Sequence, residues 1–273
     1  MPSKRLASTA AICLLLGAGT AACGDNKDSD KAAAPATSAA AAATPTATPT
    51  PTPTVAKLDT DKLSAQEIEK QAKDALASAT SLRISGKMTS DEGVMTIDMV
   101  MDSKGQCQGT MALPGMGSFE MISDGKAYFM KPDVQFWKTF GGSNPKVLAQ
   151  LKDRYLTGFQ NDPKMKDMTD FCKLTDASSQ MLDDGSSTPS KGSAGTVNGV
   201  KTFSLKEKDD QGEESVLHIA TEGTFYPVRL EKTTGKDQGQ IDFTDFDKPV
   251  TIQTPSADNV IDYTKFQDTV KSA

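Results

Sequence analysis

The side chains of this 273-residue sequence that could do chemistry are few, and four cysteines and one histidine stand out. Cys107 and Cys172 are about 65 residues apart, and neither belongs to a Cys-x-x-Cys pattern. With one histidine in the chain, a zinc site or a reactive thiol has almost no supporting residues. In an oxidising compartment an isolated pair forms a disulfide, which over this separation stabilises a fold by about 4 kcal/mol. We therefore predict a disulfide between Cys107 and Cys172, and no metal site.

The histidine and the acidic residues do not indicate catalysis. His218 lies between Leu217 and Ile219 in a pattern typical of a strand, and no Gly-x-Ser-x-Gly supplies a nucleophile. The acidic pairs Asp209-Asp210 and Glu213-Glu214 fall in a turn, where solvated surface is the plain interpretation. The sequence has neither a Walker loop nor a dinucleotide fingerprint. We predict that the protein is not an enzyme and has no cofactor.

Cys23 has a different chemistry. Two basic residues precede an uncharged apolar run from Leu6 to Gly19, and Thr20-Ala21-Ala22 then leads into Cys23, which resembles a lipobox. About 14 apolar residues are too few for a helix that spans a bilayer, which needs roughly 20. We predict that residues 1–22 are a lipoprotein signal peptide and that Cys23 is lipidated with palmitate-like chains. Two or three such chains would hold the protein on the extracytoplasmic face of the cell membrane. Ordinary secretion with a free Cys23 is the alternative.

Composition divides the mature chain into a tether and a domain. Residues 23–57 are dominated by Ala, Thr and Pro, which have too little apolar bulk to pack a core, so we predict a disordered tether. Residues 58–273 are long enough for one domain with a substantial core. The formal net charge of −6 becomes −8 once the two basic residues of the signal peptide are lost. An acidic chain without a Lys/Arg cluster predicts no nucleic-acid partner and argues against binding of anionic headgroups.

Periodicity predicts an α+β fold. A helix is expected from Ser64 to Ala79, with Ser64 and Glu67 as a capping box. Helices are also expected over residues 144–159, within residues 167–182 and near the end of the chain over 259–270, with a loop over 183–195. Because strands do not alternate with helices, we expect one curved antiparallel sheet with helices over one face. The predicted strands are Leu82–Thr89, Gly93–Met101, Cys107–Leu113, Ser118–Ser123, Ala127–Lys131, Val200–Glu207, Ser215–Ala220, Tyr226–Thr233 and Gln240–Phe246.

Several short motifs follow Cys23 and the leading helix, and their order along the chain is more informative than any one of them. They are Leu82–Gly86, Ile122–Tyr128 with Phe136-Trp137 downstream, and Tyr226–Leu230. In this order they resemble the mycobacterial LppX/LprG lipoprotein family and, more distantly, the LolA/LolB-like lipoprotein carriers, over about residues 60 to 250. The resemblance implies a half-open antiparallel β-barrel with helices covering the open face and a cavity for acyl chains. The Thr/Pro tether and the cysteine pair depart from the mycobacterial pattern and leave the ligand open.

Apolar strand residues that share one face are the predicted lining of this cavity. Methionine suits such a lining because it is flexible and polarisable, although a plain core gives the same alternation. The sequence therefore leaves two functions open. One is binding of the acyl chains of a lipid, glycolipid or lipoprotein, as a carrier or sensor, and the other is a filled half-barrel that binds another envelope protein. The predicted cavity residues are Met95, Ile97, Met99, Met101, Met111, Phe119, Met121, Phe129, Trp137, Leu217, Ile219, Val228 and Leu230, with Met130, Phe136, Ile241 and Phe243 nearby.

Overall fold

The computed structural model describes residues 55–141, 143–163, 165–174, 182, 188–209 and 211–272. The predicted signal peptide, Cys23 and most of the predicted tether lie outside these residues. None of the helices within the described ranges combines the length and apolarity that crossing a membrane requires.

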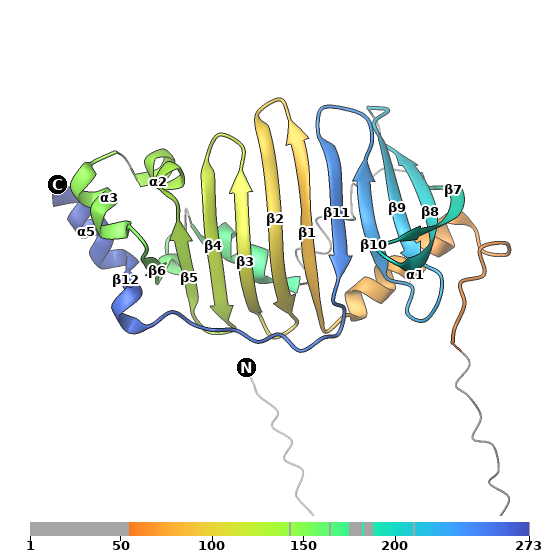
Figure 1. Ribbon diagram of the computed structural model, residues 1–273, viewed down its shortest axis with the longest axis horizontal. Helices are drawn as coiled ribbons and strands as arrows, with labels where there is room; N and C mark the ends of the chain where they lie inside the picture. The colour runs from red at the N-terminus through yellow and green to blue at the C-terminus, as the bar shows by residue number, and fades with distance from the viewer. Residues whose placement is uncertain are drawn as a thin grey trace, which may run out of the picture. The chain divides into compact units, whose positions relative to one another are not determined.

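The described residues contain one twelve-stranded sheet (Figure 1). Its spatial order is β12-β6-β5-β4-β3-β2-β1-β11-β10-β9-β8-β7, and every pair is antiparallel except β12 with β6. Since β7 and β12 are edges, the sheet is unclosed, which confirms the predicted α+β half-barrel. The strands are β1 Ser81–Ser90, β2 Gly93–Asp102, β3 Gln106–Leu113, β4 Gly117–Asp124, β5 Tyr128–Pro132, β6 Tyr155–Thr157, β7 Ser190–Val197, β8 Val200–Lys208, β9 Glu214–Ala220, β10 Pro227–Lys232, β11 Gln238–Thr244 and β12 Val260–Asp262.

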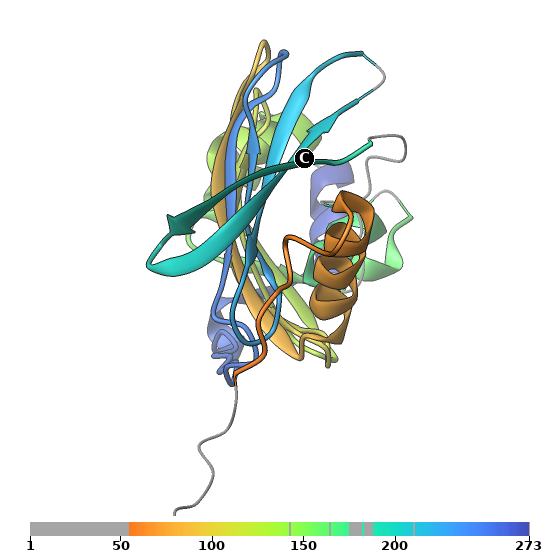
Figure 2. The ribbon, with the colours of Figure 1, turned by 90° about the vertical axis from the view of Figure 1, so that its right-hand side faces the viewer.

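Two strand glycines allow the sheet to curve. A Cβ on Gly86 of β1 would collide with the backbone of Gln240 and Ile241, and one on Gly109 of β3 with the backbone of Asp98. Only glycine permits this close approach of neighbouring strands. The curvature is visible edge-on in Figure 2, where α1 lies in the hollow of the sheet.

The helices cover the hollow and one end of the sheet. In α1 the predicted capping box is present, because the Ser64 hydroxyl accepts a hydrogen bond from the Glu67 amide (3.2 Å) and the Glu67 carboxylate accepts one from the Ser64 amide (2.7 Å). The helical elements are α1 Ala65–Ser78, α2 Val134–Gly141, α3 Pro145–Leu151, α5 Tyr263–Ser272 and the 3-10 turns η1 Phe159–Asn161, η2 Lys166–Cys172 and η3 Ala257–Asn259.

Two apolar clusters fill the inner face, which is the face that α1 covers. The larger one joins the inner residues of β1 to β5 and β11 to α2, α3, η2 and α5. The smaller one packs Ile68 and Ala72 of α1 on Leu205, Leu217 and Ile219 of β8 and β9. The inner face is thus covered by α1 at the β8 end and by several short helical elements at the β6 end.

Several predictions of local structure were wrong in part, among them the helix expected over 259–270, which begins only at Tyr263 because Val260–Asp262 pairs with β6 as β12. The expected helix over 144–159 ends at Leu151, because Asp153 adopts a left-handed φ of 59° and Tyr155–Thr157 then pairs with β5 as β6. Residues 190–195 of the expected loop belong to β7, whose backbone pairs with β8 although its residues are Gly- and Ser-rich. The helix α2 was not predicted. Of the helices expected within 167–182, η2 accounts for the residues to Cys172, and most of the rest lies outside the described residues.

Candidate functional site

The expected disulfide joins Cys107 of β3 to Cys172 of η2, with the Cα atoms 5.3 Å apart. Both cysteines are fully buried in the larger cluster. Cys107 pairs in register with Met101 of β2 and with Ser123 of β4. The bond therefore fastens η2 to the inner face of the sheet, beside the methionine-rich strands.

The methionines of the inner face are packed against other protein groups. Met99, Met101, Met111, Met121 and Met130 are each between 0 and 3% exposed. They come from β2 to β5, and all belong to the larger cluster. In the described structure this face is consequently the floor of a packed core.

Most of the other predicted cavity residues also belong to the two inner clusters. Met95 is half-buried near the start of β2, and Leu230 packs against both inner clusters. The larger cluster also contains Ile97, Phe119, Trp137, Phe136, Ile241 and Phe243, and the smaller contains Leu217 and Ile219.

Phe129 and Val228 do not lie on the inner face. Phe129 precedes the buried Met130, so the alternation of a strand turns its side chain to the other face, called the outer face below. Val228 falls at a register shift in β10 and packs with Val197 and Ala220 in a separate cluster. A bulge of this kind reverses the side that a residue faces, and the sequence pattern did not reveal it.

A hollow of about 470 Å³ lies where the larger cluster ends, between β4, β5, α2 and α3. Its apolar lining includes Phe119 and Trp137 of the predicted cavity, together with Leu148 and Leu151 of α3. The two leucines were not among the predicted cavity residues, because that prediction was drawn mainly from strands and α3 is a helix. This hollow, named the α2–α3 pocket here, is the candidate functional site.

Asp133 sets the position of α2 at the edge of the pocket. Its carboxylate accepts hydrogen bonds from the Phe136 amide (2.6 Å) and from the amide and hydroxyl of Ser118 on β4 (2.9 and 2.7 Å). Burial alone would raise the pKa of Asp133, but these hydrogen bonds outweigh it and lower the pKa below its usual value. The cap therefore ties the first turn of α2 to β4 and directs Trp137 inward.

Trp137 is 6% exposed, and its ring meets the Phe266 ring edge-on at 4.7 Å. The indole Nε1 is buried and has no hydrogen-bond partner among the described residues. A buried donor without an acceptor is costly, by about 1–3 kcal/mol. Trp137, one of the lining residues of the pocket, thus has a buried donor without a partner among the described residues.

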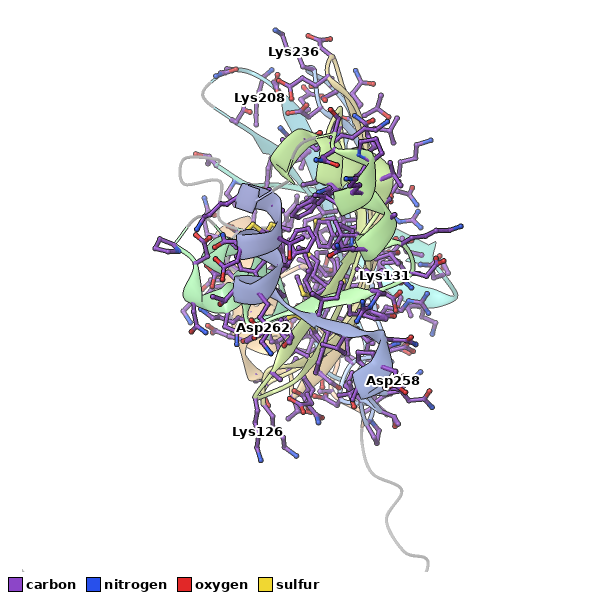
Figure 3. The ribbon with its side chains drawn as sticks, turned by 90° about the vertical axis from the view of Figure 1, so that its left-hand side faces the viewer. Lys126, Lys131, Lys208, Lys236, Asp258 and Asp262 are labelled. Atoms are coloured by element: carbon purple, nitrogen blue, oxygen red, sulfur yellow. A yellow bond between two sulfur atoms is a disulfide. The ribbon has the colours of Figure 1, made fainter. Side chains whose placement is uncertain are left out.

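The rim of the pocket is polar. Lys131 pairs with Glu120 at 2.7 Å and lies over the Tyr155 ring, 4.8 Å from its centroid. The hydrogen bond to Glu120 raises the pKa of Lys131, so the ammonium stays charged. Figure 3 shows Lys131 at this end of the molecule. An apolar lining beneath charged groups suits a ligand with one apolar and one polar end.

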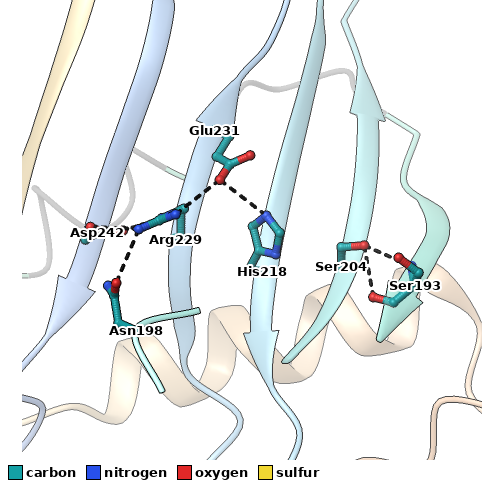
Figure 4. A network of polar contacts seen from close by, with 7 residues as sticks. All are labelled: Ser193, Asn198, Ser204, His218, Arg229, Glu231 and Asp242. Atoms are coloured by element: carbon teal, nitrogen blue, oxygen red, sulfur yellow. Dashed lines mark hydrogen bonds and ion pairs between the residues drawn. The ribbon is translucent and has the colours of Figure 1, made fainter. Parts of the chain in front are cut away.

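The lone histidine belongs to a polar network on the outer face (Figure 4). His218 Nε2 lies 3.7 Å from Glu231, too far for a hydrogen bond, and Glu231 also contacts Arg229. Ser204 is opposite His218 in the register of β8 and β9. Its hydroxyl, however, donates to the Ser193 carbonyl (3.2 Å) and accepts from the Ser193 amide (2.9 Å). Ser204 is therefore committed to β7, and the network joins neighbouring strands.

Comparison with known proteins gives likeness of fold. No protein-family model matches the sequence, and a search of curated proteins gives no match. The lipoprotein LppX of Mycobacterium tuberculosis is similar, with 13% identity over 68% of this chain and 96% of its own, at a TM-score of 0.44. LprF of Mycobacterium bovis shares 15% identity over 71% and 97%, with a TM-score of 0.45. A LolA superfamily protein of Nitrosomonas europaea shares 8% over 72% and 96%, with a TM-score of 0.25. These likenesses, at low identity and low TM-score, concern the general arrangement of the fold and no more.

Proposed function

We propose that this protein is a membrane-anchored lipoprotein whose domain binds an acyl chain of a lipid or glycolipid, as a carrier or sensor. The observation that carries the proposal is the α2–α3 pocket, whose apolar lining is continuous with the methionine-rich core. Its volume of about 470 Å³ falls within the roughly 300–1,000 Å³ of small-molecule sites.

The chemistry of the pocket supports an amphiphilic ligand. Phe119, Leu148 and Leu151 offer only apolar surface, on which each buried methylene contributes about 0.8 kcal/mol. An ester or carboxyl oxygen near the head of the chain would accept a hydrogen bond from the Trp137 N–H. Lys131 and Glu120 at the rim would then face the polar part of the ligand.

The membrane anchor is the second part of the proposal, and it is supported by the sequence alone. Lipidation of Cys23 would hold the protein on the extracytoplasmic face of the membrane, and residues 24–57 would give the domain reach. A carrier needs such reach because it has to meet its ligand at a surface and then withdraw it.

Native mass spectrometry tests the ligand. We would purify the mature chain with Cys23→Ser without detergent, record its mass, and extract it with organic solvent. We expect a stoichiometric acyl lipid in the extract, or uptake of one after incubation with lipid from the native membrane. A mass of the bare chain before and after that incubation contradicts the proposal.

A variant at the wall of the pocket tests the location. Val134 is 53% exposed and lines the pocket, so Val134→Phe narrows it without disturbing the core. We expect acyl-chain affinity to fall about tenfold, which corresponds to roughly 1.4 kcal/mol, as followed by the fluorescence of Trp137, the single tryptophan. The matched control is Val200→Phe, at an exposed valine of β8. Equal affinities in the two variants would place the ligand elsewhere.

The packing of the inner face favours a second function, a filled half-barrel that binds another protein of the envelope. Met99, Met101 and Met121 are already covered by the protein's own groups, so a ligand chain is not needed to shield them. A chain that never yields or takes up lipid, but that retains a membrane protein partner through washing, would support this function.

A further inference from the structure

A second hollow, of about 630 Å³, lies on the outer face of the sheet beside the parallel pair β6 and β12. Phe129 of β5 and Thr157 of β6 are directly paired there. Met130, which follows Phe129, and Leu156, which precedes Thr157, are buried on the inner face, so Phe129 and Thr157 point to the outer face. The connection from β11 to β12 runs along the lower edge of the sheet in Figure 1, and its residues Pro255 and Ala257 belong to the lining of the hollow. The lining consists of Phe129, Arg154, Thr157, Pro255, Ala257, Val260, Ile261, Asp262 and Lys265.

Arg154 is the unusual member of this lining. Its Nη2 donates to the Val260 carbonyl at 3.1 Å, which fixes the guanidinium against the backbone of β12. Its Nε is buried and has no hydrogen-bond partner among the described residues. Nor does Arg154 form an ion pair with any described carboxylate, whereas Arg83 pairs with Asp98. A half-buried guanidinium without an anion is an unfavourable arrangement unless a ligand supplies one.

A second cation faces the same hollow. Lys265 lies in the first turn of α5, and its side chain has no ion pair among the described residues. The only carboxylate of the lining is Asp262, labelled in Figure 3, whose Oδ1 accepts the backbone N–H of Lys265 at 3.1 Å and so begins the helix. The lining of the hollow therefore contains two cations and one carboxylate, which gives it a net positive charge. The Thr157 hydroxyl adds a further donor.

We propose that this hollow is an oxyanion site that takes a phosphate group. Arg154 would supply the planar pair of donors that phosphate accepts, with Lys265 and Thr157 beside it. The apolar residues Phe129, Val260 and Ile261 fit the phosphate of a lipid headgroup, and free phosphate offers the same charged chemistry. The sequence argued against anionic ligands because its basic residues are dispersed, but the fold brings Arg154 and Lys265 together.

The arginine side chains provide the test. The mature chain has three arginines, Arg83, Arg154 and Arg229, and the Nε of each gives its own NMR signal. Arg83 and Arg229 donate from Nε to Asp98 and Asp242, so they are internal controls. The mature chain with Cys23→Ser is titrated with inorganic phosphate and with monomeric dihexanoylphosphatidylglycerol, with sodium chloride of equal ionic strength as the reference.

We expect a saturable shift of the Arg154 Nε signal and steady signals from the other two arginines. Arg154→Gln should weaken binding about tenfold or more, since it removes a charge-assisted pair of donors. The matched control, Arg83→Gln, removes the same charge from the outer face and should leave the affinity unchanged.

The two probes separate the two sources of phosphate. A shift with phosphate and with the lipid assigns the site to any phosphate, and a shift with the lipid alone assigns it to a headgroup. No shift of Arg154 with either probe, or the same shift with chloride, overturns the proposal. The outcome is independent of the α2–α3 pocket, because acyl-chain uptake is measured separately and either result can fail alone.

Discussion

Removal of the disulfide between Cys107 and Cys172 tests how much this bond, which fastens η2 to the inner face of the sheet, contributes to stability. The bond spans 65 residues, and in the chain-entropy description a loop of this length contributes about 4 kcal/mol to the free energy of unfolding. Both cysteines are fully buried, so replacement by alanine adds a smaller loss of packing. We therefore expect the double variant Cys107→Ala/Cys172→Ala to lose about 4–5 kcal/mol.

Urea unfolding followed by Trp137 fluorescence measures this loss, because the ring packs on Phe266 within the core. With a urea slope of about 2–3 kcal/mol per molar, the midpoint should fall by about 1.5–2 M in the variant. Wild-type protein whose disulfide has been reduced in the unfolded state keeps both cysteine side chains, so its unfolding midpoint measures the loss of the covalent bond alone. We expect this loss to account for most of the fall in the midpoint.

A fall of less than about 0.5 M would refute the reasoning. It would mean that the unfolded chain is already compact around these residues, or that η2 is held mainly by its other contacts. The native protein gives a further check. Because the sulfurs are buried, a reducing agent should break the bond only as fast as η2 leaves the sheet, and immediate reduction would contradict the packing described for Cys172.

Two further predictions concern other elements. Burial and the hydrogen bond to Asp247 raise the pKa of Tyr226 to about 12, above the roughly 10 of an unfolded chain. The contribution of the protonated Tyr226 hydroxyl to the free energy of unfolding is complete below about pH 10 and is lost as the pH rises towards 12. In thermal melts the Tyr226→Phe variant should therefore lose less stability than the wild-type protein between these pH values. Equal losses in the two proteins would contradict this. Ser64→Ala removes the N-cap of α1 and should cost about 1 kcal/mol in urea unfolding. The control Ser78→Ala, in the last turn, should cost less than about 0.5 kcal/mol, and equal costs would count against the cap.

The sequence predicted the regular parts of the fold because local rules dictate them. The nine predicted strands are present, since alternating residues such as Met99 and Met101 share a face and tight turns join their strands. The capping box at Ser64 and Glu67 and the disulfide were also predictable, because each depends on two side chains and their spacing. The curved sheet followed from the order of these elements.

The remainder depends on contacts between distant residues. Whether Met121 lines a cavity or a packed core is decided by what covers it, and alternation is the same in both cases. Val228 faces away because of a bulge, and Phe129 because its neighbour Met130 takes the inner position. The Arg154 site could not be predicted either, since Lys265 joins it only after β12 has paired with β6.

Helices of different length and stability cover the two ends of the sheet, and this difference decides where a ligand could enter. At the β8 end α1 has 14 residues and a capping box, and it packs Ile68 and Ala72 on the sheet. At the other end α2 and α3 have eight and seven residues, fewer than the roughly 12–15 at which an isolated helix is even marginally stable. They persist through packing and the Asp133 cap, and β6 and β12 add only three residues each. Local opening therefore breaks the fewest interactions at this end. Both proposed sites lie there, while the filled methionine face gives the domain its rigid floor.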